Sequence, residues 1–169
     1  MDPRAIRILT IAVLASALLA ACGTAGLSLA VPTITIPAGN TGGTVCYARG
    51  EATTRLGITS ATYDAMATYR SNALVDTSTT IEVWVYGRAS DPGSTCSAPS
   101  ASDVLLGGPF TLELGVERAV TIGEGEAGEA LAALVRSGAY WIGVALDAGV
   151  SLGGERSITF DQGRVRLRF

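Results

Sequence analysis

The chain has 169 residues, a formal net charge of −3 and no histidine. The absence of histidine excludes a Ser-His-Asp or Cys-His catalytic arrangement, and it excludes a histidine-ligated zinc or copper site. The chain is mildly acidic and contains no block of consecutive basic residues, which argues against nucleic acid as a partner because neutralising phosphates requires clustered lysines or arginines.

The first 21 residues are typical of an export signal. Arg4 and Arg7 supply the positive segment, and residues 8–19 form an apolar run that small residues follow. A membrane-spanning helix needs roughly 20 apolar residues, so this run is short for a span. An uncleaved N-terminal membrane anchor is the alternative interpretation.

Residues 19–22, with the sequence LAAC, resemble the lipobox of bacterial lipoproteins. This resemblance covers only the first 22 residues. It implies that a dedicated peptidase cuts before Cys22 and that the sulfur of Cys22 carries a diacylglycerol, with palmitate among its acyl chains. The protein would then be exported and lipid-anchored to the cell membrane or outer membrane of a bacterium, and Gly23 favours the outer membrane.

The resemblance also divides the chain. Residues 1–21 are expected to be removed, residues 22–30 to form the lipid anchor and a short tether, and residues 31–169 to form a single β-sandwich domain. Removing 21 of 169 residues leaves 148, a length that suits one domain with a proper hydrophobic core.

The two remaining cysteines form an even pair if Cys22 carries lipid. In an exported, oxidising setting we expect Cys46 and Cys96 to form a disulfide. The alternative is a metal site with two thiolates, which the absence of histidine and of a CxxC spacing disfavours. No metal site and no cofactor are predicted.

Alternating patterns predict strands in the first half of the chain. Residues 31–36 and 44–49 are predicted to pair as a hairpin. In residues 59–71 the period of two favours a strand over a patchy helix, with Ala61, Tyr63, Ala65, Ala67 and Tyr69 on one face. Residues 79–88 give the clearest strand, and a loop rich in Ser, Pro and Gly follows at 89–103 and contains Cys96.

The second half of the chain predicts strands at 110–114 and 118–122, joined tightly around residues 115–116. Residues 126–137 have a helical period, with acidic residues in the first turn and Arg136 in the last. A strand at 139–147 follows, and then a terminal hairpin that bends at Gly163. About nine short strands and one short helix predict an all-β fold, an antiparallel β-sandwich of Greek-key type.

Two groups of side chains are candidates for a partner-binding surface. Trp84 and Tyr86 lie on the predicted exposed face of their strand and, with Tyr140 and Trp141, could stack on a sugar or a peptide. The alternative is that these aromatic residues belong to the core or pair across strands. The 89–103 loop is a candidate contact surface as well, or else solvent-exposed filler.

The second group is the arginine stripe, which consists of Arg164, Arg166 and Arg168 on one face of the last strand. Guanidinium groups in a row suit lipid phosphates, an acidic polysaccharide or protein carboxylates. If the strand is at a sheet edge, the same charges discourage aggregation.

Carboxylates are the remaining candidates for chemistry. Glu124, Glu126 and Glu129 could serve a glycosidase, although acidic residues also favour the first turn of a solvated helix. The loop acids could bind calcium, but no calcium-loop spacing is present; these are Asp91, Asp103, Asp147 and Asp161.

The sequence therefore predicts a lipid-anchored lipoprotein of the cell envelope with a structural or binding role, no enzymatic activity, and an envelope protein or glycan as partner. The alternative hypothesis is a carboxylate-dependent hydrolase that acts on envelope carbohydrate.

Overall fold

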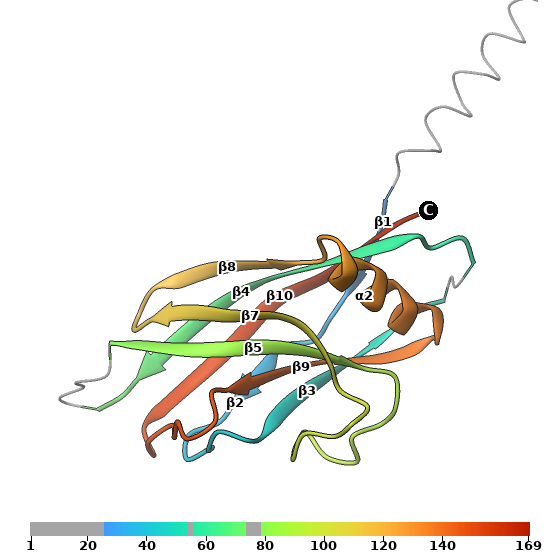
Figure 1. Cartoon of the computed structure of the whole chain (residues 1–169). Helices are drawn as coiled ribbons and strands as arrows, with labels where there is room; N and C mark the ends of the chain where they lie inside the picture. The colour runs from blue at the N-terminus through green and yellow to red at the C-terminus, as the bar shows by residue number, and fades with distance from the viewer. Residues whose placement is uncertain (1–25, 54–55, 74–78) are drawn as a thin grey trace, which may run out of the picture.

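The computed structural model describes residues 26–53, 56–73 and 79–169. These residues form two antiparallel β-sheets that pack face to face and one helix that covers one end of them (Figure 1). The predicted all-β sandwich with a single helix is confirmed. Within the described residues there are ten strands, and no helix there is long and apolar enough to cross a membrane.

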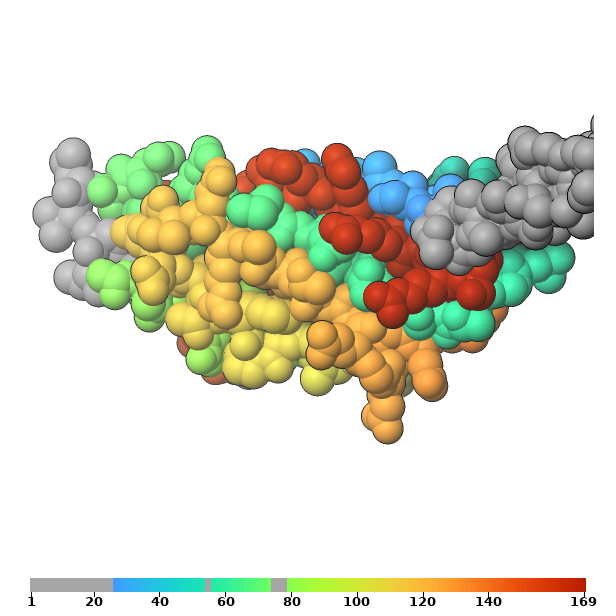
Figure 2. Space-filling model, turned by 90° about the horizontal axis from the view of Figure 1, so that it is seen from above, coloured from blue at the N-terminus to red at the C-terminus, as the bar shows by residue number. Residues whose placement is uncertain are grey.

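The first sheet has the strand order β1-β10-β4-β8, and β2 also pairs with β10. Its strands are β1 (Leu27–Ala30), β2 (Ile34–Ile36), β4 (Ser60–Ser71), β8 (Glu117–Ile122) and β10 (Arg156–Arg168). Figure 2 views the outer face of this sheet, where β10 (red) lies between β4 (green) and β1 (blue).

The second sheet has the strand order β6-β3-β9-β5-β7. Its strands are β3 (Val45–Glu51), β5 (Thr80–Arg88), β6 (Cys96–Ser97), β7 (Val104–Glu113) and β9 (Ala139–Leu146). The core lies between the two sheets. On β4, the five residues predicted to share a face are all buried, which confirms the period-two prediction for this segment.

Two predicted hairpins are wrong. β2 pairs with β10 in the first sheet, whereas β3 pairs with β6 and β9 in the second. Likewise β7 pairs with β5 and β8 with β4, so the turn at Gly115 carries the chain from one sheet to the other. Local turn residues mark a reversal of direction, but they do not specify whether the next strand joins the same sheet.

The predicted terminal hairpin is also wrong. Residues 156–168 form one strand, β10, with a bulge between Asp161 and Arg164 where Gln162 has a φ of 53°. The bulge adds one residue to β10. The buried positions consequently change from even numbers, at Ile158 and Phe160, to odd numbers, at Val165 and Leu167.

The expected tether at 22–30 overlaps the fold. β1 pairs with the end of β10, with Leu27 opposite Leu167 and Ala30 opposite Arg164. The sandwich therefore begins before residue 31, and only residues 23–26 remain between Cys22 and the first strand.

The predicted helix at 126–137 is confirmed as α2 (Glu126–Arg136). Its apolar face buries Leu131, Leu134 and Val135 against the sheets. Gly87 on β5 permits this approach, because a Cβ there would lie 2.3 Å from Leu134 Cδ1. At the other side of the helix, the guanidinium of Arg136 donates a hydrogen bond to the carbonyl of Ile58 (2.7 Å).

Two tyrosines in the core are expected to make the stability of the fold depend on pH. Tyr63 on β4 and Tyr140 on β9 are fully buried. Burial raises the pKa of Tyr140 to about 12, and burial, followed by the nearby Tyr140, raises the pKa of Tyr63 further. Because the folded-state pKa values exceed the unfolded value of about 10, their contribution to stability is complete below pH 10 and is lost as the pH rises from 10 to 12 and beyond.

We therefore expect the urea midpoint to stay constant up to pH 9 and to fall between pH 10 and 12, as the free energy of unfolding decreases by on the order of 2 kcal/mol for each tyrosine. The measurement is urea unfolding at pH 8 to 12 for the native chain and for the Tyr63→Phe and Tyr140→Phe variants. Each variant should show a shallower fall. Identical curves for all three proteins would contradict the prediction.

Candidate functional site

The outer face of the second sheet carries aromatic and basic side chains in register across three neighbouring strands. β3, β9 and β5 align so that their outward residues form three cross-strand rows. We call these nine residues the aromatic face: Val45, Ala145 and Trp84 in the first row, Tyr47, Gly143 and Tyr86 in the second, and Arg49, Trp141 and Arg88 in the third. Several of them form a hydrophobic cluster separate from the core.

Gly143 leaves room for the ring of Tyr47 in the second row. A Cβ at this position would lie 2.6 Å from Val45 Cγ1 and 2.7 Å from Tyr47 Cδ1. Because glycine occupies it, the Tyr47 ring can lie across β9. A side chain at this position would have to displace Tyr47, so the central glycine sets the shape of the aromatic face.

Two arginines lie over aromatic rings of this face. The guanidinium carbon of Arg49 is 5.8 Å from the centroid of the Trp141 ring, and that of Arg88 is 6.0 Å from the centroid of the Tyr47 ring. Both distances suit cation–π attraction. Arg49 also forms an exposed ion pair with Glu51 at 3.0 Å, which contributes little to stability because solvent screens it.

Asp103 ties the end of the 89–103 loop to the aromatic face. Its Oδ1 accepts a hydrogen bond from the Tyr47 hydroxyl (2.7 Å) and is 3.9 Å from the guanidinium of Arg88, while Oδ2 accepts from the Ser100 backbone N–H (2.6 Å). The Asp103 side chain is only 3% exposed. Burial, followed by the hydrogen bond to Asp103, raises the pKa of Tyr47 to about 12, so this hydroxyl remains a donor at neutral pH.

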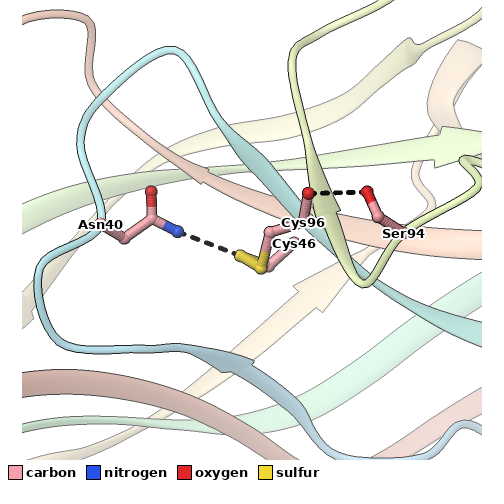
Figure 3. Close-up of a disulfide and its surroundings, with 4 residues drawn as sticks. All are labelled: Asn40, Cys46, Ser94 and Cys96. Carbon is pink, nitrogen blue, oxygen red and sulfur yellow. Dashed lines mark hydrogen bonds between the residues drawn. A yellow bond between two sulfur atoms is a disulfide. The ribbon is translucent and has the colours of Figure 1, made fainter.

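The predicted disulfide between Cys46 and Cys96 is confirmed (Figure 3). Cys96 lies on the two-residue strand β6, directly opposite Cys46 on β3, so it is paired with the sheet and not in an open loop. Asn40 Nδ2 donates to Cys46 Sγ (3.2 Å), and Ser94 Oγ donates to the carbonyl of Cys96 (2.8 Å).

The 89–103 loop forms one wall of a shallow pocket at the third row. The Tyr47 backbone N–H donates to the carbonyl of Thr95 (2.7 Å), which holds this part of the loop beside β3. The loop pocket has a volume of about 280 Å³. It is lined by Tyr47, Arg49 and Trp141 from the sheet and by Asp91, Pro92, Gly93, Ser94 and Thr95 from the loop.

The structure separates the four predicted platform aromatics. Trp84, Tyr86 and Trp141 lie half-buried on the aromatic face, but Tyr140 points into the core from the opposite face of β9 and is wrong as a platform residue. Sequence reasoning did not select Tyr47, Arg49 or Arg88. Tyr47 and Arg49 alternate with their neighbours along residues 45–51, and this alternation places both side chains on one face of the strand. Which residues they meet on the neighbouring strands follows only from the strand register.

The arginine stripe lies on the outer face of the first sheet, and all three of its arginines are exposed. β10 lies between β4 and β1, so the sheet-edge interpretation of these charges is wrong. Arg166 Nε is 3.1 Å from Asp64 Oδ2, and Asp64 Oδ1 also accepts a hydrogen bond from the Thr121 hydroxyl (2.9 Å).

The candidate carboxylates before and within the helix are all exposed. Glu124 and Glu129 line a polar groove of about 620 Å³ together with Arg166 and Arg168. Of the four loop acids, Asp91 accepts a hydrogen bond from the Gly93 backbone N–H (2.8 Å), and Asp103 accepts the hydrogen bond from the Tyr47 hydroxyl. Across the described ranges, no group of three or more acidic or cysteine residues is placed to hold a metal ion.

No protein-family model matches the sequence, and a comparison with curated proteins finds no relative.

Proposed function

We propose that this protein is a lipid-anchored component of the bacterial cell envelope that binds an envelope glycan in the loop pocket, at the third row of the aromatic face. The observation that carries the proposal is the third row, where Trp141 lies between Arg49 and Arg88 beside a pocket that a disulfide-bonded loop completes. The role is binding, and the anchor keeps the binding domain at the membrane.

The chemistry of the loop pocket suits a sugar. A half-exposed tryptophan ring offers a flat apolar surface on which the C–H face of a pyranose can stack. Arg49 and the polar loop residues Ser94 and Thr95 lie around it and can bond to hydroxyl or carboxylate groups. A small number of polar groups around an aromatic surface is the usual composition of a small-ligand site.

The anchor in this proposal is Cys22, which lies outside the described residues. The lipobox resemblance at residues 19–22 supports it. Two or three acyl chains on one residue give a stable membrane anchor, whereas a single chain gives only reversible binding.

The binding proposal is tested with purified full-length protein and envelope glycan fragments, in a direct binding titration. Trp141→Ala should weaken binding by at least tenfold, which corresponds to ~1.4 kcal/mol. Trp84→Ala is the matched control, because Trp84 lies on the same sheet face but two rows away and does not line the loop pocket. It should bind within about twofold of the native chain, or ~0.4 kcal/mol.

Other results would redirect the assignment. Equal affinity of the native and Trp141→Ala chains would refute the loop pocket as the site. Cleavage of the glycan that is lost in a Glu124→Gln/Glu129→Gln variant would instead favour the hydrolase alternative. Binding to an envelope protein with no affinity for glycan would assign the same face to a protein partner.

A further inference from the structure

The end of the domain where β1 begins carries exposed apolar side chains. Leu56 is 87% exposed, Phe169 56% and Leu27 36%, and these are three of the six large hydrophobic residues that are exposed among the described residues. Single exposed hydrophobic residues are ordinary, whereas a group of them indicates an interaction surface.

These three residues come from neighbouring segments. A Cβ at Gly57 would lie 3.7 Å from Phe169 Cδ1, and the Thr59 backbone N–H donates to the carbonyl of Arg168 (2.8 Å). Leu27 is opposite Leu167 in the pairing of β1 with β10. In Figure 1 the start of β1 and the C-terminus accordingly lie together at one end of the sandwich.

Arginines border this apolar group. Arg168 is exposed and forms no ion pair within the described part of the chain. Arg136 lies close by, because its guanidinium bonds to the carbonyl of Ile58. Glu124 and Glu129 line the same groove as Arg166 and Arg168, so acidic side chains also lie next to these arginines. We call Leu27, Leu56, Phe169, Arg136 and Arg168 the entry end.

The length of chain between Cys22 and β1 limits where the entry end can lie. Leu27 follows Cys22 by five residues, and five residues reach at most ~18 Å when fully extended. A lipid on Cys22 would thus hold this end of the domain within reach of the lipid headgroups, while the opposite end, at residues 38–43 and 147–154, is far from it.

We infer that the entry end docks onto the phospholipid surface of the membrane that holds the anchor. Leu56 and Phe169 enter the boundary between headgroups and acyl chains, and Arg136 and Arg168 contact lipid phosphates. The inference rests on the proposed anchoring at Cys22. Beyond anchoring, the docked domain has a fixed orientation relative to the membrane and does not rotate freely on its tether.

The test uses the full-length protein, purified from bacterial membranes and reconstituted into vesicles of phosphatidylcholine and phosphatidylglycerol that contain a photoactivatable phosphatidylglycerol. After irradiation, mass spectrometry maps the lipid crosslinks. We expect them at residues 56–59 and 166–169, and at least fivefold fewer at residues 38–43 and 147–154. Leu56→Ser/Phe169→Ser should reduce the crosslinks severalfold while the protein remains in the vesicle fraction.

Val116→Ser is the matched control, because Val116 is also exposed (49%) but lies in the turn between β7 and β8. It should leave the crosslinks unchanged. Crosslinks spread evenly over the domain, with the protein still in the vesicle fraction, would overturn the docking inference and leave the anchor standing. Failure of the native chain to remain with the vesicles would overturn both.

Discussion

Replacement of both cysteines of the disulfide by alanine (Cys46→Ala/Cys96→Ala) is expected to lower the free energy of unfolding by about 4 kcal/mol. The disulfide joins residues 50 positions apart, and its removal restores the freedom of that loop in the unfolded chain. Cys46 is fully buried, so alanine also leaves unfilled space. Since small domains are stable by only about 5–15 kcal/mol, this loss is a large part of the total.

Urea unfolding, followed by tryptophan fluorescence, measures the effect, and the native chain with a reductant should behave like the double variant. The reductant should not shift the midpoint of the double variant itself. A second effect should accompany the first: glycan binding should weaken even where the domain is folded, because the 91–95 segment loses its covalent link to β3. An unchanged urea midpoint for the double variant would contradict this account.

Cys22→Ser should abolish acylation of the protein completely. When cells are grown with a palmitate analogue, the native chain should incorporate it and partition with the membranes, because the thiol of Cys22 is the only group to which the diacylglycerol of the proposed modification attaches. The variant should carry no label.

Cys46→Ala/Cys96→Ala is the control for this experiment, since it removes the other two cysteines of the chain and keeps the anchor. It should retain its label, even if less protein accumulates. Equal labelling of the native chain and Cys22→Ser would refute the lipid anchor, and retention of an unlabelled native chain in the membrane would favour the uncleaved N-terminal anchor instead.

Alternation of apolar residues predicted individual elements well. β4, β5 and α2 lie close to their predicted positions because each has one buried face and one more exposed face, and burial imposes the period on the sequence. β9 also lies close to its predicted position, although its residues 142–146 are buried on both faces. The same rule failed at β10. There the bulge shifts the buried positions by one residue, and an uninterrupted strand looks like two strands separated by a bend.

Pairing between strands was less predictable. A hairpin prediction assumes that neighbours in the sequence are neighbours in the sheet, whereas β2 and β3, like β7 and β8, belong to different sheets. The disulfide was an exception, because three cysteines and one proposed lipid site leave a single pair.

The candidate site was predicted only in part. Trp84, Tyr86 and Trp141 were selected because they are aromatic residues in strands, and the structure places all three on one face. Tyr140 was selected on the same ground and is in the core. The position of Trp141 between Arg49 and Arg88 depends on the registers of two separate strand pairs, and the sequence of a single strand contains no information about them.

The place of β10 in the first sheet bears on when this protein can fold. β10 is the last described strand, yet it lies in the middle of the sheet, where it pairs with β1 and β2 on one side and β4 on the other. A ribosome delivers the chain from its N-terminus, so β1, β2 and β4 lack their common neighbour until residues 156–168 have been synthesised. Pairings between such distant segments also form slowly. The topology thus keeps the first sheet incomplete until β10 has been synthesised, and a nascent chain that ends before residue 156 leaves β1, β2 and β4 without the strand that joins them.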